Sequence, residues 1–116
     1  MFYAVFFENS LVGGVSLTKT SIPTWAIFFK DDIKPYISLS AIYIFLNHIF
    51  SLNIEKLEAK LKKTNKSAYR FNKFFGIEIT EYDARYYLTK ITKSQWIDHK
   101  QKLKIFNRDI QYQFIV

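Results

Sequence analysis

One stretch, residues 38–76, constrains the fold of this chain most, because it predicts a helix, a strand and a second helix in succession. Apolar residues recur at helical spacing through residues 38–50 and lie nearly all round, which predicts a well-buried helix. Apolar and charged residues then alternate through residues 54–61, as in a half-buried strand. Helical spacing returns through residues 65–75 and ends at Gly76, a residue typical of a helix C-terminus.

Further strands are predicted on both sides of this stretch. Residues 2–8 and 11–17 read as an antiparallel hairpin, residues 26–29 as a third strand, and residues 77–80 and 85–92 as a second hairpin. A helix capped by Ser94 is predicted over residues 95–106, and residues 110–116 alternate as a last strand would. The predicted fold class is therefore α+β.

The long helix also sets a strand direction. It connects residues 26–29 to residues 54–61, and crossovers of this kind join parallel strands. We expect these two strands to run parallel within one mixed, mostly antiparallel sheet. The residues expected to be nearly fully buried are Phe45, Ile49, Leu57, Ala68, Phe71 and Phe75.

Composition narrows the classes of function. A chain of 116 residues suits one small domain. It contains no cysteine, which excludes a disulfide framework and a thiol nucleophile, and His48 and His99 do not suggest a metal site. No apolar run is long enough to span a bilayer and no signal peptide is evident, so we expect a cytoplasmic protein without a membrane partner.

The net charge of +7 favours anionic partners. Nucleic acid is the weaker interpretation of this charge, because the chain shows no recognisable nucleic-acid-binding motif and its aromatic residues are explained better as core.

One family resemblance rests on two short segments, Asn65-Lys66-Ser67-Ala68 and Lys73-Phe74-Phe75-Gly76-Ile77. Together they resemble the "N-x-x-A … K-x-G-F" signature of the GNAT N-acetyltransferases. Within that superfamily the chain looks most like the N-acetyltransferases of nucleotide-linked amino sugars in pseudaminic acid biosynthesis, which also follow the glycine with an acidic hairpin and paired tyrosines, as in residues 81–87.

The resemblance implies a fold and a division of the chain. A GNAT-like mixed, mostly antiparallel sheet flanked by helices is expected over residues 1–92, missing the first strand and first two helices of the family. Residues 93–116 would then form a C-terminal extension of a helix and a strand. Because this leaves the edge of residues 2–8 or 11–17 open, we expect a homodimer, with the tail covering that edge in the same chain or in a second one.

The resemblance also implies a reaction, the transfer of acetyl from acetyl-CoA to a small-molecule amine. The implied cofactor-binding residues lie on the third strand, at the start of the first helix and around the second helix; they are Phe28, Phe29, Ile37, Ser38, Ser40, Asn65 and Arg70. The family's glycine-rich phosphate-binding turn corresponds to residues 35–40, which contain no glycine. Ser38 and Asn65 can equally be plain helix caps, and Arg70 part of a solvated basic face.

Catalytic residues are left open. The family's tyrosine four residues before the glycine corresponds to Asn72, and an amide cannot protonate a thiolate. Tyr69, Asn72 and Glu78 are the candidates, and no metal site is expected. The alternative function is a non-catalytic GNAT-like binding or interaction module that has lost cofactor binding.

Overall fold

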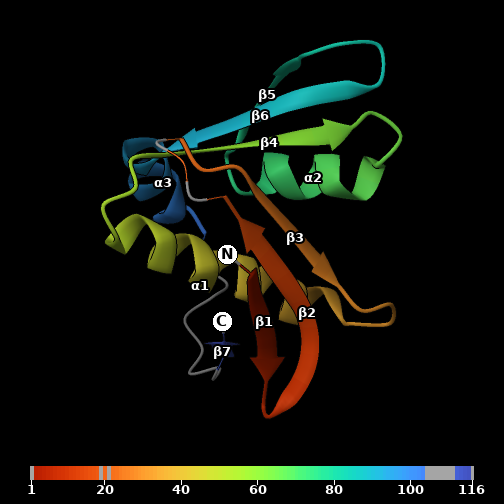
Figure 1. Cartoon of the computed structure of the whole chain (residues 1–116), viewed down its shortest axis with the longest axis vertical. Helices are drawn as coiled ribbons and strands as arrows, with labels where there is room; N and C mark the ends of the chain where they lie inside the picture. Colours follow the sequence, from red (N-terminus) through yellow and green to blue (C-terminus); the bar gives the residue numbers. More distant parts are fainter. Residues whose placement is uncertain (1, 19, 21, 104–111, 116) are drawn as a thin grey trace.

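A computed structural model describes residues 2–18, 20 and 22–103 and the backbone of residues 112–115. The elements follow in the order β1 (Phe2–Phe7), β2 (Ser10–Leu17), β3 (Trp25–Phe29), α1 (Pro35–Ser51), β4 (Lys56–Lys62), α2 (Lys66–Phe74), β5 (Glu78–Glu81), β6 (Tyr86–Thr92), α3 (Lys93–Lys100) and β7 (Tyr112–Ile115) (Figure 1). Each predicted strand is present, with ends that differ by one or two residues.

The strands form two antiparallel sheets, with orders β3-β2-β1-β7 and β4-β6-β5. The sheets meet at one parallel bridge between Thr24 and Glu58, where the Glu58 N–H donates to the Pro23 carbonyl at 3.0 Å. Beyond this bridge β3 and β4 diverge (Figure 1). The expected parallel direction is confirmed, but the expected single sheet is wrong, because strands that diverge cannot continue a hydrogen-bonded ladder.

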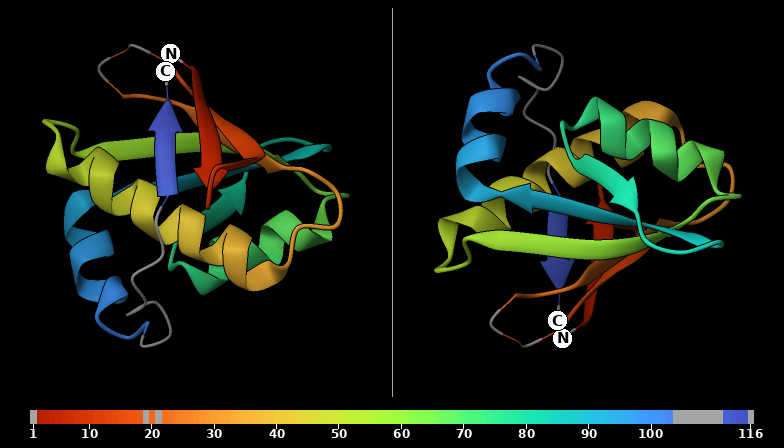
Figure 2. Two further views of the ribbon diagram at one scale, coloured as in Figure 1. Left: turned by 90° about the horizontal axis from the view of Figure 1, so that it is seen from below. Right: turned by 90° about the horizontal axis from the view of Figure 1, so that it is seen from above.

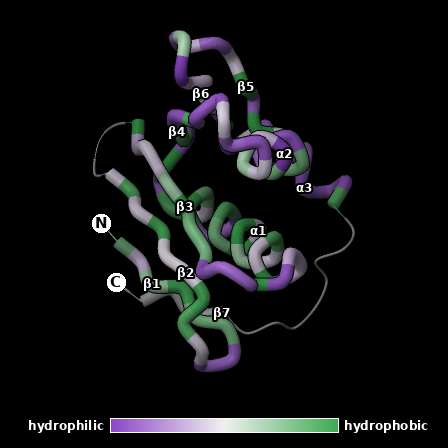
Figure 3. Tube along the Cα trace, turned by 90° about the vertical axis from the view of Figure 1, so that its right-hand side faces the viewer, coloured by the Kyte–Doolittle hydropathy of each residue, from purple (hydrophilic) through white to green (hydrophobic). Residues whose placement is uncertain are grey.

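Helix α1 covers one face of the first sheet and forms the centre of the core. The ring of Phe45 stacks on Trp25 at 5.8 Å between centroids and meets Tyr3 edge-on at 6.1 Å. Apolar residues gather on α1, β1 and β2, whereas α2 and the β5–β6 hairpin carry more polar ones (Figure 3). Burial of Phe45, Ile49, Leu57 and Phe75 is confirmed.

Helix α1 begins at Pro35 and not near Ser38 as predicted. Proline suits the first helical position because its φ is already helical and its missing N–H would be unpaired there in any case. Lys34 before it is extended, at φ −64° and ψ 141°, as a residue before proline prefers. Ser38 is therefore not a cap, and lies inside the first turn.

Helices α2 and α3 lie on one side of the second sheet (Figure 2). In α2, the Asn65 side-chain oxygen accepts the Ala68 N–H at 3.0 Å, as expected of an N-cap. Helix α3 is capped by Thr92 and not by Ser94 as predicted, because Thr92 and Gln95 form a reciprocal capping box. The buried Trp96 then donates its Nε1–H to the Asn47 side-chain oxygen at 2.9 Å, so α3 packs into the same core as α1.

Strand β7 pairs antiparallel with β1, from Ala4 opposite Ile115 to Phe7 opposite Tyr112. The tail thus covers the edge of β1 within one chain, and the homodimer stays a prediction. Residues 104–111, which include the end of the predicted last helix, lie outside the described residues. None of the described helices is long and apolar enough to cross a membrane.

Candidate functional site

The edge of β3 that faces β4 has backbone groups without partners. The Thr18 N–H donates to the Thr24 carbonyl at 3.0 Å and the Lys30 N–H to the Val12 carbonyl at 2.9 Å, so the even-numbered residues of this segment pair with β2. Alternation along a strand then turns the N–H and C=O groups of Ile27 and Phe29 towards β4. The Thr24–Glu58 bridge is the one pairing described between the two strands, so this edge is open to an extended ligand.

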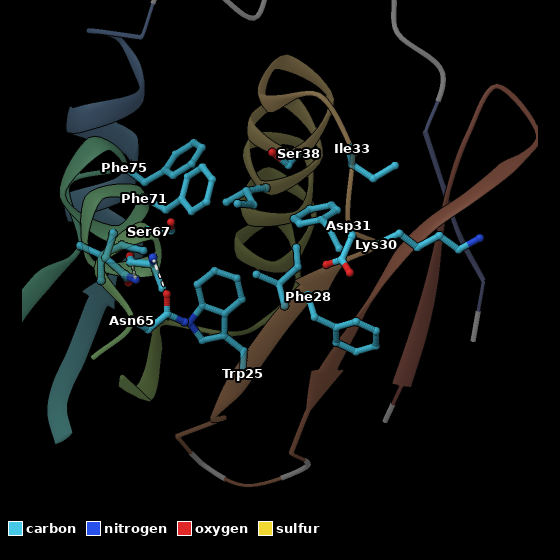
Figure 4. Close-up of a pocket in the computed structure, with 16 residues that line it drawn as sticks. Trp25, Phe28, Lys30, Asp31, Ile33, Ser38, Asn65, Ser67, Phe71 and Phe75 are labelled. Atoms are coloured by element: carbon cyan, nitrogen blue, oxygen red, sulfur yellow. Dashed lines mark hydrogen bonds between the residues drawn. The ribbon is translucent and has the colours of Figure 1, made fainter. Parts of the chain in front are cut away.

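A cavity of about 590 Å³ lies beside this edge, between β3, the first turns of α1 and α2 (Figure 4). Its walls are partly apolar and partly polar. The apolar part includes Trp25 and Ile27 on the strand and Phe71 and Phe75 at the other side. Ala68 and Phe71 are half-buried, not fully buried as predicted, because their side of α2 lines this cavity. The apolar face of α2 therefore lines a space of ligand size and also contacts the core.

A second cavity, of about 230 Å³, lies between β3 and β4 and reaches Lys60 and Lys62 on β4. The two cavities share a set of lining residues, namely Trp25, Ile27, Asn65, Ala68 and Asn72. They therefore meet at one junction, which two reactants can approach from different sides.

The first cavity reaches the N-terminus of α1, where Lys30, Asp31 and Ser38 line it. Helix N-termini bind phosphate through free N–H groups. Here Pro35 has no N–H, and the Ile37 and Ser38 N–H groups donate to the Lys34 carbonyl at 2.9 and 3.3 Å. This end of α1 consequently has fewer free donors than most helix N-termini, and the Lys30 side chain beside it points away from the cavity (Figure 4).

The structure brings together most of the residues predicted to bind the cofactor. Phe28, Phe29, Ser38 and Asn65 line the first cavity. The Ser38 hydroxyl donates back to the Pro35 carbonyl at 3.1 Å.

The other three predicted residues lie outside the first cavity. Ile37 and Ser40 are buried but do not line it, and the Ser40 hydroxyl donates to the Tyr36 carbonyl. Arg70 lines an adjacent hollow of about 270 Å³, which shares Ser67 and Phe71 with the cavity.

The three catalytic candidates are separated. Asn72 lies at the junction of both cavities, with its Nδ2 donating to the Ala68 carbonyl at 2.7 Å. Tyr69 is on another face of α2, with its ring 5.5 Å from that of Tyr87, and the exposed Glu78 lines neither cavity. Among the described lining residues of the two cavities, Asp31 is the one carboxylate and there is no tyrosine, histidine or cysteine.

Sequence reasoning missed several residues that line the site, among them Trp25, Lys30 and Asp31. Their signal was weak, since each lies just outside the strand predicted at residues 26–29. A tryptophan before a short strand and a charged pair after it are also ordinary in surface loops.

No family model and no curated protein matches the sequence. The solved structures that share its architecture include the Campylobacter jejuni N-acetyltransferase PseH in complex with acetyl coenzyme A, with a TM-score of 0.70 and 18% identity over 78% of this chain and 66% of that one. A GCN5-related N-acetyltransferase from Brucella melitensis matches with a TM-score of 0.74 and 16% identity over 87% of this chain and 54% of that one. FdhC, a nucleotide-linked sugar GNAT, matches with a TM-score of 0.70 and 14% identity over 89% of this chain and 65% of that one.

This chain spans about two thirds of the length of PseH and FdhC and about half that of the Brucella protein. At these identities the likeness concerns the fold. The two sheets that part between β3 and β4, with α1 and α2 beside the gap, have the fold of the GNAT N-acetyltransferases.

Proposed function

We propose that this chain is an N-acetyltransferase that transfers acetyl from acetyl-CoA to an amine. The observation that carries the proposal is the open edge of β3 beside a cavity that meets a second cavity at Asn72. An extended arm ending in a thioester fits the first cavity, and an amine can reach its end through the second. The structure of PseH with acetyl coenzyme A supports the choice of cofactor.

The pantetheine arm would pair with the free backbone groups of Ile27 and Phe29, in the way a peptide adds to a sheet edge. The Asn65 side-chain oxygen already caps α2, which leaves its side-chain N–H groups for the arm. The pyrophosphate would lie at the N-terminus of α1, where Ser38 lines the cavity.

In the transfer, the amine nitrogen attacks the thioester carbonyl, the C–S bond breaks, and the CoA sulfur leaves as a thiolate that takes up a proton. Asn65 and Asn72 are the polar side chains that line both cavities, and because Asn65 caps α2, Asn72 is the one assigned to this chemistry. One of its Nδ2 hydrogens is used by Ala68 and the second can stabilise the carbonyl oxygen. An amide does not protonate a thiolate, so water would carry to the sulfur the proton that the amine nitrogen gives up as it forms the amide.

For the acceptor we propose a nucleotide-linked amino sugar, which the similarity to FdhC and PseH supports. A cytoplasmic location and a homodimer belong to the same proposal. The test of the acceptor is the release of free CoA thiol with a panel of amines that contains amino-sugar nucleotides, simple amino sugars and polyamines.

The second candidate is a non-catalytic GNAT-like binding or interaction module that has lost cofactor binding. It is favoured by the described lining of the two cavities, which offers one carboxylate, Asp31, and no tyrosine, histidine or cysteine for proton transfer. Absence of acetyl-CoA binding, with no release of CoA thiol in the presence of any amine of the panel, would select this candidate over the enzyme.

Substituting proline into β3 tests where the cofactor binds. Ile27→Pro removes an N–H that faces the gap and leaves the pairing with β2 intact, so we expect acetyl-CoA binding to weaken about tenfold or more, since a hydrogen bond is lost and the arm is displaced. Isothermal titration calorimetry measures the affinity, and thermal melting reports stability.

Ala26→Pro is the matched control, because Ala26 lies in the register that pairs with β2. We expect this variant to melt at a clearly lower temperature than Ile27→Pro. Unchanged acetyl-CoA affinity in Ile27→Pro would contradict the placement of the arm. Absence of binding by the parent protein at millimolar acetyl-CoA would overturn the acetyltransferase proposal.

A further inference from the structure

A third hollow, of about 340 Å³, lies on the face of α2 that points away from both cavities. Its described lining is three cations and two tyrosines: Lys63, Lys66, Tyr69, Arg70 and Tyr87. None of these residues lines either cavity between β3 and β4. The hollow therefore lies apart from the two cavities, although Arg70 also lines the hollow of about 270 Å³ next to the first one.

The two tyrosines place aromatic rings side by side on neighbouring elements. Tyr69 of α2 and Tyr87 of β6 have ring centroids 5.5 Å apart at an interplanar angle of 52°. Both side chains are half-buried, so part of each ring surface stays open to a ligand. The Lys73 Nζ lies over the Tyr69 ring, 5.6 Å from its centroid, and the Lys63 Nζ lies over the Tyr87 ring, 5.2 Å from its centroid. Each ring therefore carries a positive charge on one face, and a ligand would stack on the other.

The positive charge here is not balanced within α2. The helix contains Lys66, Arg70 and Lys73 and no acidic residue. Like charges three and four residues apart repel each other on a helix. The ion pairs among the described residues are Lys56–Glu58 and Lys63–Glu81, so neither involves α2. An anion bound at this face would relieve the repulsion.

We propose that this hollow binds a nucleoside phosphate. The phosphates would lie between Lys66 and Arg70, near the N-terminus of α2, and the base would stack against Tyr69 and Tyr87. A bounded hollow with five lining residues fits one nucleotide and not a long single strand, which requires a continuous basic groove. Stacking does not read the identity of a base, so purine and pyrimidine nucleotides should bind alike.

Calorimetry with ADP and UDP, in the presence of saturating acetyl-CoA, tests the site. Pyrophosphate lacks the base and loses the stacking, and adenosine lacks the phosphates and loses the charge contacts. Each should therefore bind at least about tenfold more weakly than ADP. Lys66→Glu should weaken ADP binding about tenfold or more. The exposed Lys102, which follows α3, supplies the control of equal charge change, and Lys102→Glu should bind ADP as the parent does.

Tyr69→Leu should also weaken ADP binding about tenfold, and its melting temperature separates this effect from loss of the fold. Several results would overturn the proposal: no binding of ADP by the parent protein, pyrophosphate binding as tightly as ADP, or equal affinities for Lys66→Glu and Lys102→Glu. Competition between ADP and acetyl-CoA would assign the nucleotide to the cofactor site instead. Tighter binding of an oligouridine RNA than of UDP would point to an extended nucleic-acid surface.

Discussion

Gly76 ends α2 in the left-handed region of backbone conformation, at φ 72°. Two features require glycine here. The conformation is unfavourable for a residue with a Cβ, and a Cβ at this position would lie 2.5 Å from Cγ of His99. His99 is itself held, because its Nε2–H donates to the Phe74 carbonyl at 2.9 Å. One residue thus both stops α2 and lets α3 pack against its end.

Gly76→Ala should destabilise the fold by roughly 1–3 kcal/mol, through backbone strain and the contact with His99. Urea denaturation measures the free energy of unfolding. In a His99→Ala background the contact is removed and the strain remains, so the same substitution should be less destabilising there. Equal losses in the two backgrounds would show that the His99 ring is not in the way.

At the scale of elements, α2 is the helix whose two sides differ most in role. Phe71 and Phe75 both line the first cavity. Phe75, just after the last turn, is 1% exposed and packs against Phe74 and Trp96, whereas Phe71 is half-buried. Along the same helix Asn65 and Ala68 also turn towards the cavity. No residue within α2 is fully buried, so this helix is held mainly by its cap and by Phe75 and Ile77 beyond its end.

The two phenylalanines give a matched pair of variants. Phe75→Ala should destabilise the fold by roughly 3–5 kcal/mol, as expected for a fully buried phenylalanine. Phe71→Ala should destabilise it by less, about 1–2 kcal/mol, and should weaken acetyl-CoA binding because it removes part of the cavity wall. Denaturant melts and calorimetry on both proteins measure these effects. A larger loss of stability for Phe71→Ala than for Phe75→Ala would contradict the described packing.

At the scale of the whole molecule, the decisive feature is that two antiparallel sheets meet at one bridge and then part. The bridge at Thr24 and Glu58 holds β3 and β4 together at one end. Where the two strands diverge, a cavity takes the place of further strand pairing. Strand edges without partners usually invite association. Here the exposed edge faces a space of ligand size, which favours a small ligand over another strand.

Hydrogen exchange should report this open edge directly. The amides of Ile27 and Phe29 face the gap, so we expect them to exchange fast in the free protein and to become protected when acetyl-CoA binds. The amides of Ala26 and Phe28, in register with β2, should be protected in both states. NMR-detected exchange resolves the four positions. Equal protection of all four in the free protein would mean that the gap is closed in solution.

The sequence alone determined the features that depend on neighbours along the chain. Asn65 marks the start of α2 and Gly76 its end, because a cap and a stop act within one turn. The parallel direction of β3 and β4 follows from the long helix between them. Pro35 carries a local signal too, because proline suits the first position of a helix. The prediction that α1 begins near Ser38 is wrong because it gives the role of cap to the serine.

Tertiary structure decided the rest, because it depends on distances between segments that the local pattern does not contain. Helical spacing shows that Ala68, Phe71 and Phe75 share a face, but not that β3 and β4 diverge and leave part of that face lining a cavity. Neighbouring residues of a helix point about 100° apart, so Tyr69 turns to Tyr87 while its neighbour Ala68 and, one turn later, Asn72 reach the junction of the two cavities. Which of the two could meet a substrate was set by the placement of α2 against β3 and β6.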